Sequence, residues 1–314
     1  MNSEFSGNIV DSTGAPLVAW GETVFLKRLF EELEAQLGDD FSRFTFVVHR
    51  RVFGEIAGSK INLDPGGPNR VLIVISDECE AFPCQEFQSY RVVFRAYGSP
   101  LGGDSRIHAF PVGYLNAAGL VEPVEFDQRQ VTVFFSGYLN RNRLDVYKQF
   151  RPVWWLPKRN LSQNRYIREI ARRAAERFTK ERSFPDAIPG GHVAFTDWFG
   201  RGLAPEEYAQ TLANSRIAIC PPGFESHETI RHWEAMRLGC VVISAPLPPN
   251  RFYSNSPIIQ LSDWSDLKPT VNRLLNNPSE LRARHLATVD WWKKACSEKA
   301  VADYMARIIV MPDS

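Results

Sequence analysis

The sequence lacks the patterns that mark several common classes of protein. Its five cysteines form no Cys-x-x-Cys pair, so neither a zinc knuckle nor a redox pair is supported. It has no Gly-x-Gly-x-x-Gly loop and no P-loop, which argues against dehydrogenases and NTPases. No apolar run approaches the ~18 residues of a membrane helix. The N-terminus has neither the basic nor the apolar region of a signal peptide. Together these absences predict a soluble protein of a reducing, cytoplasmic compartment.

Charge and composition describe an ordinary globular chain. The 37 basic and 36 acidic residues give a formal net charge of +1, which argues against a nucleic-acid partner. Hydrophobic residues make up 44% of the 314 positions and charged residues 23%, enough to bury a sizeable core. The length suits two domains or one large one.

Alternating apolar runs predict two α/β halves. In the first half, apolar residues at every fourth position predict a helix over 22–37, and short apolar runs predict strands at 44–48, 71–75, 90–94 and 107–112. Residues 116–128 have little apolar content and suit a linker. The second half predicts strands at 131–135, 193–195, 216–220 and 241–244 and helices at 163–178, from 205, at 226–238 and over 279–310. We therefore expect Rossmann-like, doubly wound domains at 1–120 and 121–314, the second including a helical tail.

The segment from Ile217 to Ser244 carries the clearest chemistry. It reads as strand, Pro/Gly turn, helix, Gly stop and strand, an arrangement that places ligands at the carboxyl ends of the strands. The first helical turn offers free N–H groups and the positive end of the helix dipole to a phosphate. Gly223 lets the backbone approach a ligand closely. We expect a phosphate-bearing ligand here.

Three polar residues of the predicted helix share one face. His227, Arg231 and Glu234 stand at i, i+4 and i+7. An arginine can clamp a diphosphate with two hydrogen bonds, and a carboxylate one turn further can accept both hydroxyls of a ribose. A solvated helix face with an Arg–Glu pair is the alternative that spacing leaves open.

The same segment resembles the nucleotide-sugar half of the exostosin-like glycosyltransferases. The resemblance covers about residues 205–265 and rests on Tyr208, Ser215, Cys220-Pro-Pro-Gly223, Arg231-His-Trp-Glu234-Ala and Gly239-Cys-Val-Val-Ile243. Thr229 stands where the family often has Ser, and Val241-Val242 replaces a small residue and Pro. The resemblance implies a GT-B fold, two Rossmann-like domains facing a cleft. It also implies a nucleotide-sugar donor, with UDP expected as its nucleotide, Arg231 on the diphosphate and Glu234 on the ribose.

A second phosphate contact is expected in the loop after the strand at 131–135. Arg141 and Arg143 follow Gly137 there, and in GT-B enzymes this loop faces the cleft. A surface loop with solvated arginines is the alternative. Because the sequence contains no Asp-x-Asp, and arginines can neutralise a leaving diphosphate, we expect no metal and no further cofactor.

The catalytic base is expected in the first domain. An inverting transfer needs a group that takes the proton of the acceptor hydroxyl. Asp77 and Glu78 follow the strongest strand of that half, although a helix N-cap with its acidic neighbour is the commoner explanation of such a pair. His49 is the reserve candidate, against the alternative of a structural histidine. We also expect the two domains to close around the donor, which would exclude water.

The partners implied are a nucleotide sugar and a glycan or lipid-linked acceptor. Trp154-Trp155, with cationic neighbours, leaves open a peripheral contact with the inner face of a membrane, although Pro152 and Pro157 favour a packed turn. Oligomeric state is not encoded in these patterns. The competing interpretations are a degenerate transferase fold that binds a nucleotide or glycan without turnover, and another nucleotide-using enzyme such as a sugar epimerase.

Overall fold

The computed structural model divides the chain into two compact units, and each is described by itself. The first unit comprises Met1–Leu120, Pro248–Ser256 and Trp291–Ser314, and the second comprises Val121–Leu247 and Pro257–Asp290. The structure describes residues 5–12, 17, 21–50, 63, 65–76, 78, 84–97, 105–151, 183–185, 187–197 and 201–311. The predicted helix at 163–178, the Trp154-Trp155 pair and Asp77 lie outside these residues.

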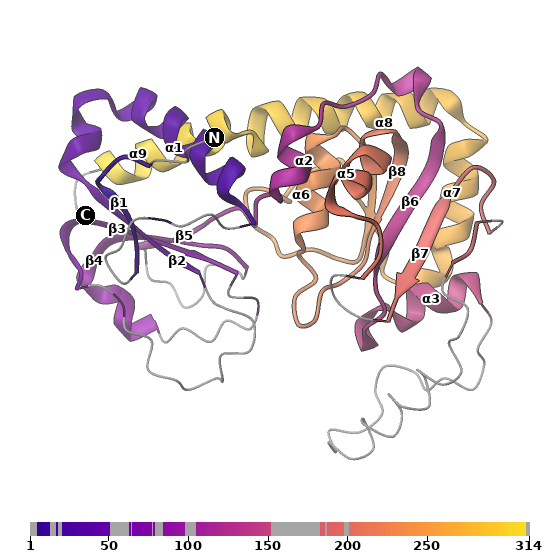
Figure 1. Cartoon of the computed structure of the whole chain (residues 1–314), viewed down its shortest axis with the longest axis horizontal. Coiled ribbons are helices and arrows are strands. Elements are labelled where there is room, and N and C mark those ends of the chain that lie inside the picture. The colour runs from indigo at the N-terminus through magenta and orange to yellow at the C-terminus, as the bar shows by residue number, and fades with distance from the viewer. Residues whose placement is uncertain are drawn as a thin grey trace, which may run out of the picture. The chain divides into compact units, whose positions relative to one another are not determined.

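The first unit is built on a parallel five-stranded sheet (Figure 1). Its strand order follows the chain: β1 (Ile9–Asp11), β2 (Thr45–Arg50), β3 (Gly67–Ile75), β4 (Tyr90–Arg95) and β5 (Ile107–Ala109). The strands predicted from apolar runs are confirmed, because a run such as Val71–Ile75 is buried on both faces of a parallel sheet. The helices of this unit are α1 (Thr23–Leu37), α2 (Asn116–Leu120) and α9 (Glu298–Val310), with short 3₁₀ turns at Gly38–Arg43 and Cys84–Ser89.

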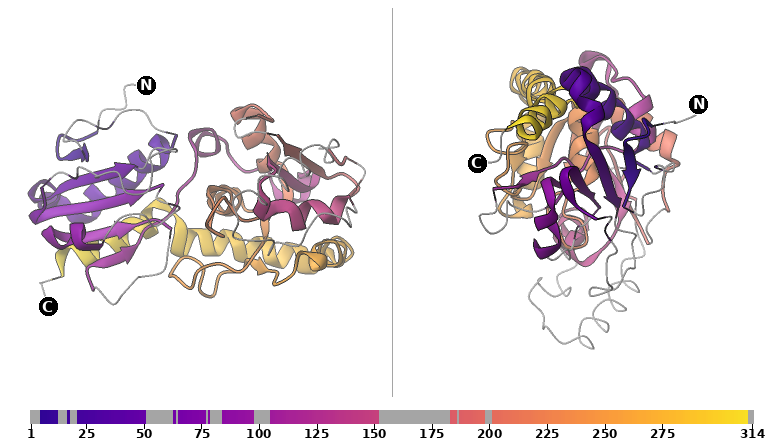
Figure 2. Two further views of the ribbon diagram at one scale, coloured as in Figure 1. Left: turned by 90° about the horizontal axis from the view of Figure 1, so that it is seen from below. Right: turned by 90° about the vertical axis from the view of Figure 1, so that its left-hand side faces the viewer.

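Helices α1 and α9 pack side by side on one face of this sheet (Figures 1 and 2). Helix α1 buries its predicted apolar stripe, including Phe25, Leu29 and Leu33. The ring of Phe30 meets Phe46 of β2 at 5.5 Å between centroids, which identifies the sheet face that α1 covers. Residues 291–314 group with the first sheet, whereas the predicted second domain, 121–314, included the whole tail.

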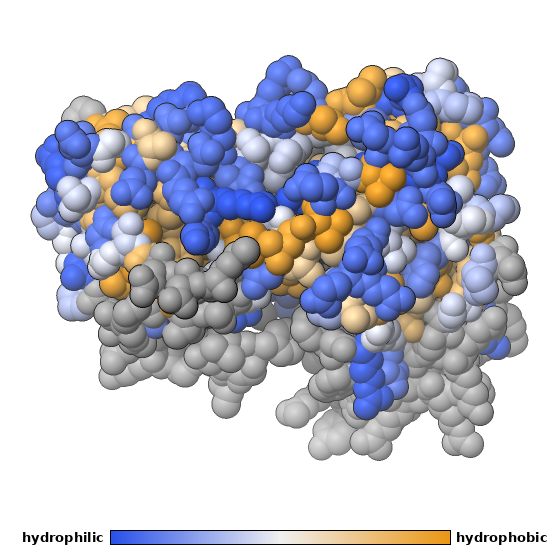
Figure 3. Space-filling view, turned by 45° about the horizontal axis from the view of Figure 1, so that its top comes forward, coloured by the Kyte–Doolittle hydropathy of each residue, from blue (hydrophilic) through white to orange (hydrophobic). Residues whose placement is uncertain are grey.

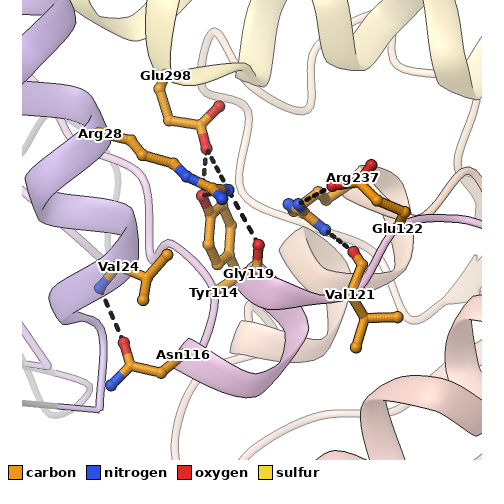
Figure 4. Close-up of polar contacts among 9 residues, drawn as sticks. All are labelled: Val24, Arg28, Tyr114, Asn116, Gly119, Val121, Glu122, Arg237 and Glu298. Atoms are coloured by element: carbon orange, nitrogen blue, oxygen red, sulfur yellow. Dashed lines mark hydrogen bonds and ion pairs between the residues drawn. The ribbon is translucent and has the colours of Figure 1, made fainter. Parts of the chain in front are cut away.

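A polar cluster fastens α1, α2 and α9 within the first unit (Figure 4). The Tyr114 hydroxyl hydrogen-bonds the Glu298 carboxylate, and Arg28 Nη1 donates to Gly119 O at 3.0 Å and to the Tyr114 hydroxyl at 3.3 Å. The Val24 N–H donates to Asn116 Oδ1 at 2.8 Å. Burial, followed by the charge of Glu298, raises the pKa of Tyr114 above its usual range, so this hydroxyl stays a donor.

The second unit also contains a parallel five-stranded sheet, but its strand order reverses. The order is β10 (Ile259–Gln260), β9 (Val241–Ser244), β8 (Ser215–Cys220), β6 (Val131–Tyr138) and β7 (His192–Thr196). The chain therefore moves from β6 to β7 on one side and continues to β8 on the other. Such a switch point opens a crevice at the carboxyl ends of the strands, where ligands of open α/β sheets bind.

Helices of the second unit connect these strands and complete its core. They are α3 (Leu144–Phe150), α5 (Pro205–Ala213), α6 (Ile230–Arg237), α7 (Leu267–Leu275) and α8 (Pro278–Trp291), with 3₁₀ turns at Phe126–Gln128, Arg141–Arg143 and Trp264–Asp266. After α8 the chain forms a π-helical turn at Trp292–Cys296 before α9. At the start of this unit, Val121 O accepts a hydrogen bond from Arg237 at 2.8 Å, and Arg237 lies 3.9 Å from Glu122 (Figure 4). Two parallel α/β units confirm the predicted fold class.

The described surface is mostly hydrophilic on the face drawn in Figure 3. The exposed large apolar side chains among the described residues are Leu115, Leu120, Leu286, Val310 and Met311. Among the same residues, no helix combines the length and apolar character required to cross a bilayer.

Replacing Tyr114 with Phe should lower the free energy of unfolding by about 1–3 kcal/mol, because the Glu298 carboxylate would lose its buried donor. Tyr304→Phe is the matched control, since its ring packs on Phe94 but its hydroxyl makes no hydrogen bond to a described residue. Urea unfolding followed by fluorescence measures both. Equal stabilities of the two variants would contradict this role for Tyr114.

Candidate functional site

The candidate site lies at the carboxyl ends of β6 and β8, on either side of the switch point. Strand β6 ends with Ser136, Gly137 and Tyr138, and β8 ends at Cys220, directly before the Pro-Pro-Gly turn. The two strands pair in parallel, so their carboxyl ends meet at the same edge of the sheet. Helix α6 begins after this turn and carries Arg231 and Glu234.

Gly137 is required by the position of Arg231. A Cβ atom at residue 137 would lie 2.3 Å from Arg231 Nη2 and 3.3 Å from Arg143 Nη1. In that space Arg231 Nη2 donates to Ser136 O at 3.0 Å. Arg231 and Arg143 also lie over the ring of Phe135, with 5.7 and 6.0 Å from the guanidinium carbons to the ring centroid. The sequence marked Gly137 only as a neighbour of the loop, yet its missing side chain admits both guanidinium groups.

Arg143 is buried, and its side chain hydrogen-bonds backbone carbonyl groups. Its side chain donates from Nε to Pro222 O and from Nη1 to Tyr138 O, each at 2.8 Å, and the residue is 5% exposed. The alternative of a solvated surface arginine is therefore excluded for Arg143. Arg141 is different, because its exposed side chain pairs with the exposed Glu225 at 3.0 Å. Direct phosphate contact by Arg141 and Arg143 stays a prediction.

Two asparagines join the same loop to the Pro-Pro-Gly turn. Asn140 Nδ2 donates to Gly223 O at 3.1 Å, and Asn142 Nδ2 donates to Gly223 O at 3.1 Å and to Phe224 O at 2.6 Å. Asn140 Oδ1 also accepts from the Asn142 N–H at 2.9 Å. Sequence reasoning missed both residues; an Asn soon after an apolar strand, as at Asn140, is the local signal for such an Asx-turn.

Glu234 is buried, which excludes the solvated helix face left open by its spacing. Only 3% of Glu234 is exposed. It hydrogen-bonds Tyr208 of α5, and the pKa of that tyrosine is raised first by burial and then by the charge of Glu234. The ring of Tyr208 packs edge-on against Phe134 of β6 at 5.1 Å between centroids. The carboxylate is thus held in a fixed place beside the strand ends.

The prediction that α6 begins at residue 226 is wrong. The helix begins at Ile230, because Thr229 and His232 form a capping box that closes the first turn. His227 lies in the turn before the helix, so it does not share a helical face with Arg231 and Glu234. Its Nδ1 is 2.8 Å from Pro246 O. Binding of a nucleotide by His227 stays a prediction.

His232 connects this capping box to β9. Nδ1 lies 3.1 Å from both the Thr229 N–H nitrogen and Thr229 O, and Nε2 shares a hydrogen bond with Ser244 Oγ at 2.7 Å. Burial lowers the pKa of His232 from its ordinary 6.5 to about 4. Sequence reasoning missed His232, although its place three residues after Thr229 is the capping-box position.

Arg231 offers a hydrogen-bond donor for an anion at this edge. Arg231, Glu234 and Arg143 all act electrostatically on the buried Cys220 thiol, whose pKa is raised mainly by burial. The loop after β6, the turn after β8 and α6 together carry Arg141, Arg143 and Arg231 and the carboxylates Glu225, Glu228 and Glu234. Among the described residues, Arg231 Nε is buried without a hydrogen-bond partner. A buried donor in that state costs free energy, which a bound anion would recover.

The predicted base residues lie in the first unit. Glu78 is partly exposed and follows β3 and Ser76, whose φ is 60°. Asp77 is outside the described residues. His49 is buried within β2. The catalytic role of Asp77 and Glu78 stays a prediction.

Several solved structures are similar to this chain, whereas no protein-family model and no curated protein sequence matches it. Sucrose-phosphate synthase from Thermosynechococcus elongatus is 13% identical with a TM-score of 0.45, over 91% of this chain and 77% of that one. A UDP-forming α,α-trehalose-phosphate synthase from Burkholderia xenovorans is 10% identical with a TM-score of 0.45, over 95% and 80%. TarM is 8% identical with a TM-score of 0.41, over 78% of this chain and 55% of TarM, so the chain spans about half the length of TarM.

The architecture is therefore assigned from the two sheets of the chain, since similarities of this size carry no argument about activity. The resemblance to the exostosin-like family stays a prediction, and the site is assigned from its own contacts.

The free energy of unfolding should fall as the pH is lowered from about 6.5 towards 4. His232 is neutral in the folded protein, with a pKa of about 4, and binds a proton in the unfolded chain below about 6.5. Above pH 6.5 the titration of His232 costs the folded protein no stability. At pH 4 it should have lowered the free energy of unfolding by about 3 kcal/mol. Urea unfolding across this range should show a shallower pH dependence for His232→Gln than for the wild type. Coinciding slopes would exclude His232 as the titrating group.

Proposed function

We propose that the chain is a glycosyltransferase that moves a sugar from a UDP-sugar donor to a glycan or lipid-linked glycan acceptor. The observation that carries the proposal is the guanidinium of Arg231. This guanidinium packs against Gly137, at the carboxyl end of β6. Arg231 belongs to the same short helix, α6, as the buried Glu234. A cationic side chain and a buried carboxylate one turn apart match the diphosphate and ribose of a nucleotide.

The diphosphate would be bound by Arg231. Its buried Nε has no hydrogen-bond partner among the described residues, while its Nη2 is anchored to Ser136 O. The positive end of the α6 dipole would add to this anion site, and Gly223 would let the backbone approach the ligand. Arg143 contributes positive charge from behind, and the exposed Arg141 would reach the phosphates from the rim.

The ribose would be bound by Glu234, whose carboxylate is oriented by its hydrogen bond to Tyr208. Two oxygens of one carboxylate suit the paired hydroxyls of a ribose. His227 would complete the donor site from the turn before α6.

We further propose that the reaction inverts the anomeric centre and needs no divalent metal. The sequence has no Asp-x-Asp, and positive charge at the site comes from arginines, which can stabilise a leaving diphosphate. The base would come from Asp77 or Glu78 of the first unit.

Glu234→Gln should weaken UDP binding by about 1.5 kcal/mol or more, because the ribose would lose charge-assisted hydrogen bonds. The amide keeps the shape of the side chain and can still accept from Tyr208, so the fold should be retained. Glu206→Gln, on the exposed first turn of α5, is the control. Isothermal titration calorimetry measures both. UDP affinity equal to wild type in Glu234→Gln would reject the ribose assignment.

Turnover should persist when divalent ions are removed. A panel of UDP-sugars incubated with the protein in excess EDTA should release UDP at the rate seen with added Mg²⁺ or Mn²⁺. Loss of release in EDTA and its recovery with metal would reject the metal-free mechanism. UDP binding without release from any donor, with or without metal, would instead identify a binding module.

A further inference from the structure

We propose that His232 and Ser244 are positioning residues that set the place of Arg231 and Glu234. The hydrogen bond between His232 Nε2 and Ser244 Oγ, at 2.7 Å, ties the first turn of α6 to the last residue of β9. The inference rests on the proposed function only for the identity of the ligand. Neither residue is proposed to touch the substrate.

A histidine at this position of the capping box can make a second hydrogen bond outside the helix. In an ordinary capping box a Glu or Gln at the third helical position accepts the N–H of the N-cap residue and goes no further. Here Nδ1 of His232 accepts the Thr229 N–H at 3.1 Å, and the opposite ring nitrogen remains to reach Ser244. One imidazole therefore fixes both where α6 begins and how far it lies from β9.

The hydrogen bond between His232 and Ser244 lies at the ligand-binding edge of the sheet, because Ser244 is at the carboxyl end of β9. Ser244 pairs with Cys220, the last residue of β8, from which the Pro-Pro-Gly turn departs. A second tie runs in the same direction, from His227 Nδ1 to Pro246 O at 2.8 Å. The start of α6 is thus held against β9 on one side, while Asn142 and Arg143 hold the preceding turn on the other.

The contact of Arg231 with Ser136 depends on where the first turn of α6 lies. Arg231 immediately precedes His232, and its Nη2 lies where a side chain at Gly137 would have to be. Because α6 has only eight residues, its first turn sets the position of the whole helix, including Glu234. Loss of the tie to β9 should therefore displace both residues relative to Ser136.

The test uses a pair of serines with the same burial in the same sheet. Ser244 and Ser215 are both 0% exposed, and each uses its hydroxyl inside the fold. Ser215 lies at the amino end of β8, where its Oγ donates to Thr211 O at 2.5 Å, away from the ligand-binding edge. Ser244→Ala and Ser215→Ala should both reduce stability, but only the first should disturb the site.

Calorimetry with UDP, at a temperature where every variant is folded, gives the first readout. We expect Ser244→Ala and His232→Gln to weaken UDP binding about tenfold, the size of one well-placed hydrogen bond, and Ser215→Ala to stay within about twofold of wild type. His232→Gln keeps an acceptor for the Thr229 N–H. A loss of UDP affinity in this variant therefore reports the missing hydrogen bond to Ser244. Equal UDP affinities for Ser244→Ala and Ser215→Ala would overturn the proposal.

The second readout needs no ligand. The Arg231 Nε–Hε signal in a ¹H–¹⁵N NMR spectrum, assigned by its disappearance in Arg231→Lys, should shift in Ser244→Ala and stay in place in Ser215→Ala. An unmoved signal in Ser244→Ala would overturn the positioning role. If wild-type protein does not bind UDP, the proposed donor is wrong, and this signal still decides whether Ser244 positions Arg231.

Discussion

The second unit depends on one close contact, in which the guanidinium of Arg231 occupies the space beside Gly137. The hydrogen bond to Ser136 O joins residues 95 positions apart in the chain, and it is possible only because residue 137 has no Cβ. This contact connects α6 to the carboxyl end of β6. It also presents a cationic group, with one buried nitrogen lacking a described partner, at the place where an open α/β sheet receives its ligand.

The turn between β8 and α6 is fastened from both sides, and this explains why it can carry a site. From the side of β6, Asn140, Asn142 and Arg143 donate to its carbonyl groups. From the side of β9, two histidines reach Pro246 and Ser244. A backbone held in this way changes little when an anion arrives, so less binding free energy is lost to ordering the loop. Buried Arg143 serves this rigidity with two hydrogen bonds to backbone carbonyls.

Much of the fold and the rough location of the site were predictable from local pattern. Apolar runs identified the strands, and the apolar stripe of α1 identified that helix, because both depend on neighbours in the sequence. The start of α6 was not predictable from local pattern. The choice between residues 226 and 230 depends on the Thr229 capping box and on the hydrogen bond of His232 to Ser244 of β9. The grouping of the tail also depended on packing, because α9 buries its apolar face against α1.

The sequence by itself determined two parallel α/β units, the Pro-Pro-Gly turn after β8 and the order of an arginine and a glutamate on the following helix. These properties follow from periodicity and residue type within short segments. Only the tertiary structure decided that Glu234 is buried, that Arg143 is engaged with backbone carbonyls and that Arg231 retains a buried nitrogen without a described partner. The reason is physical: burial and hydrogen-bond partners are properties of the space around a side chain, and here that space is built by segments far apart in the chain.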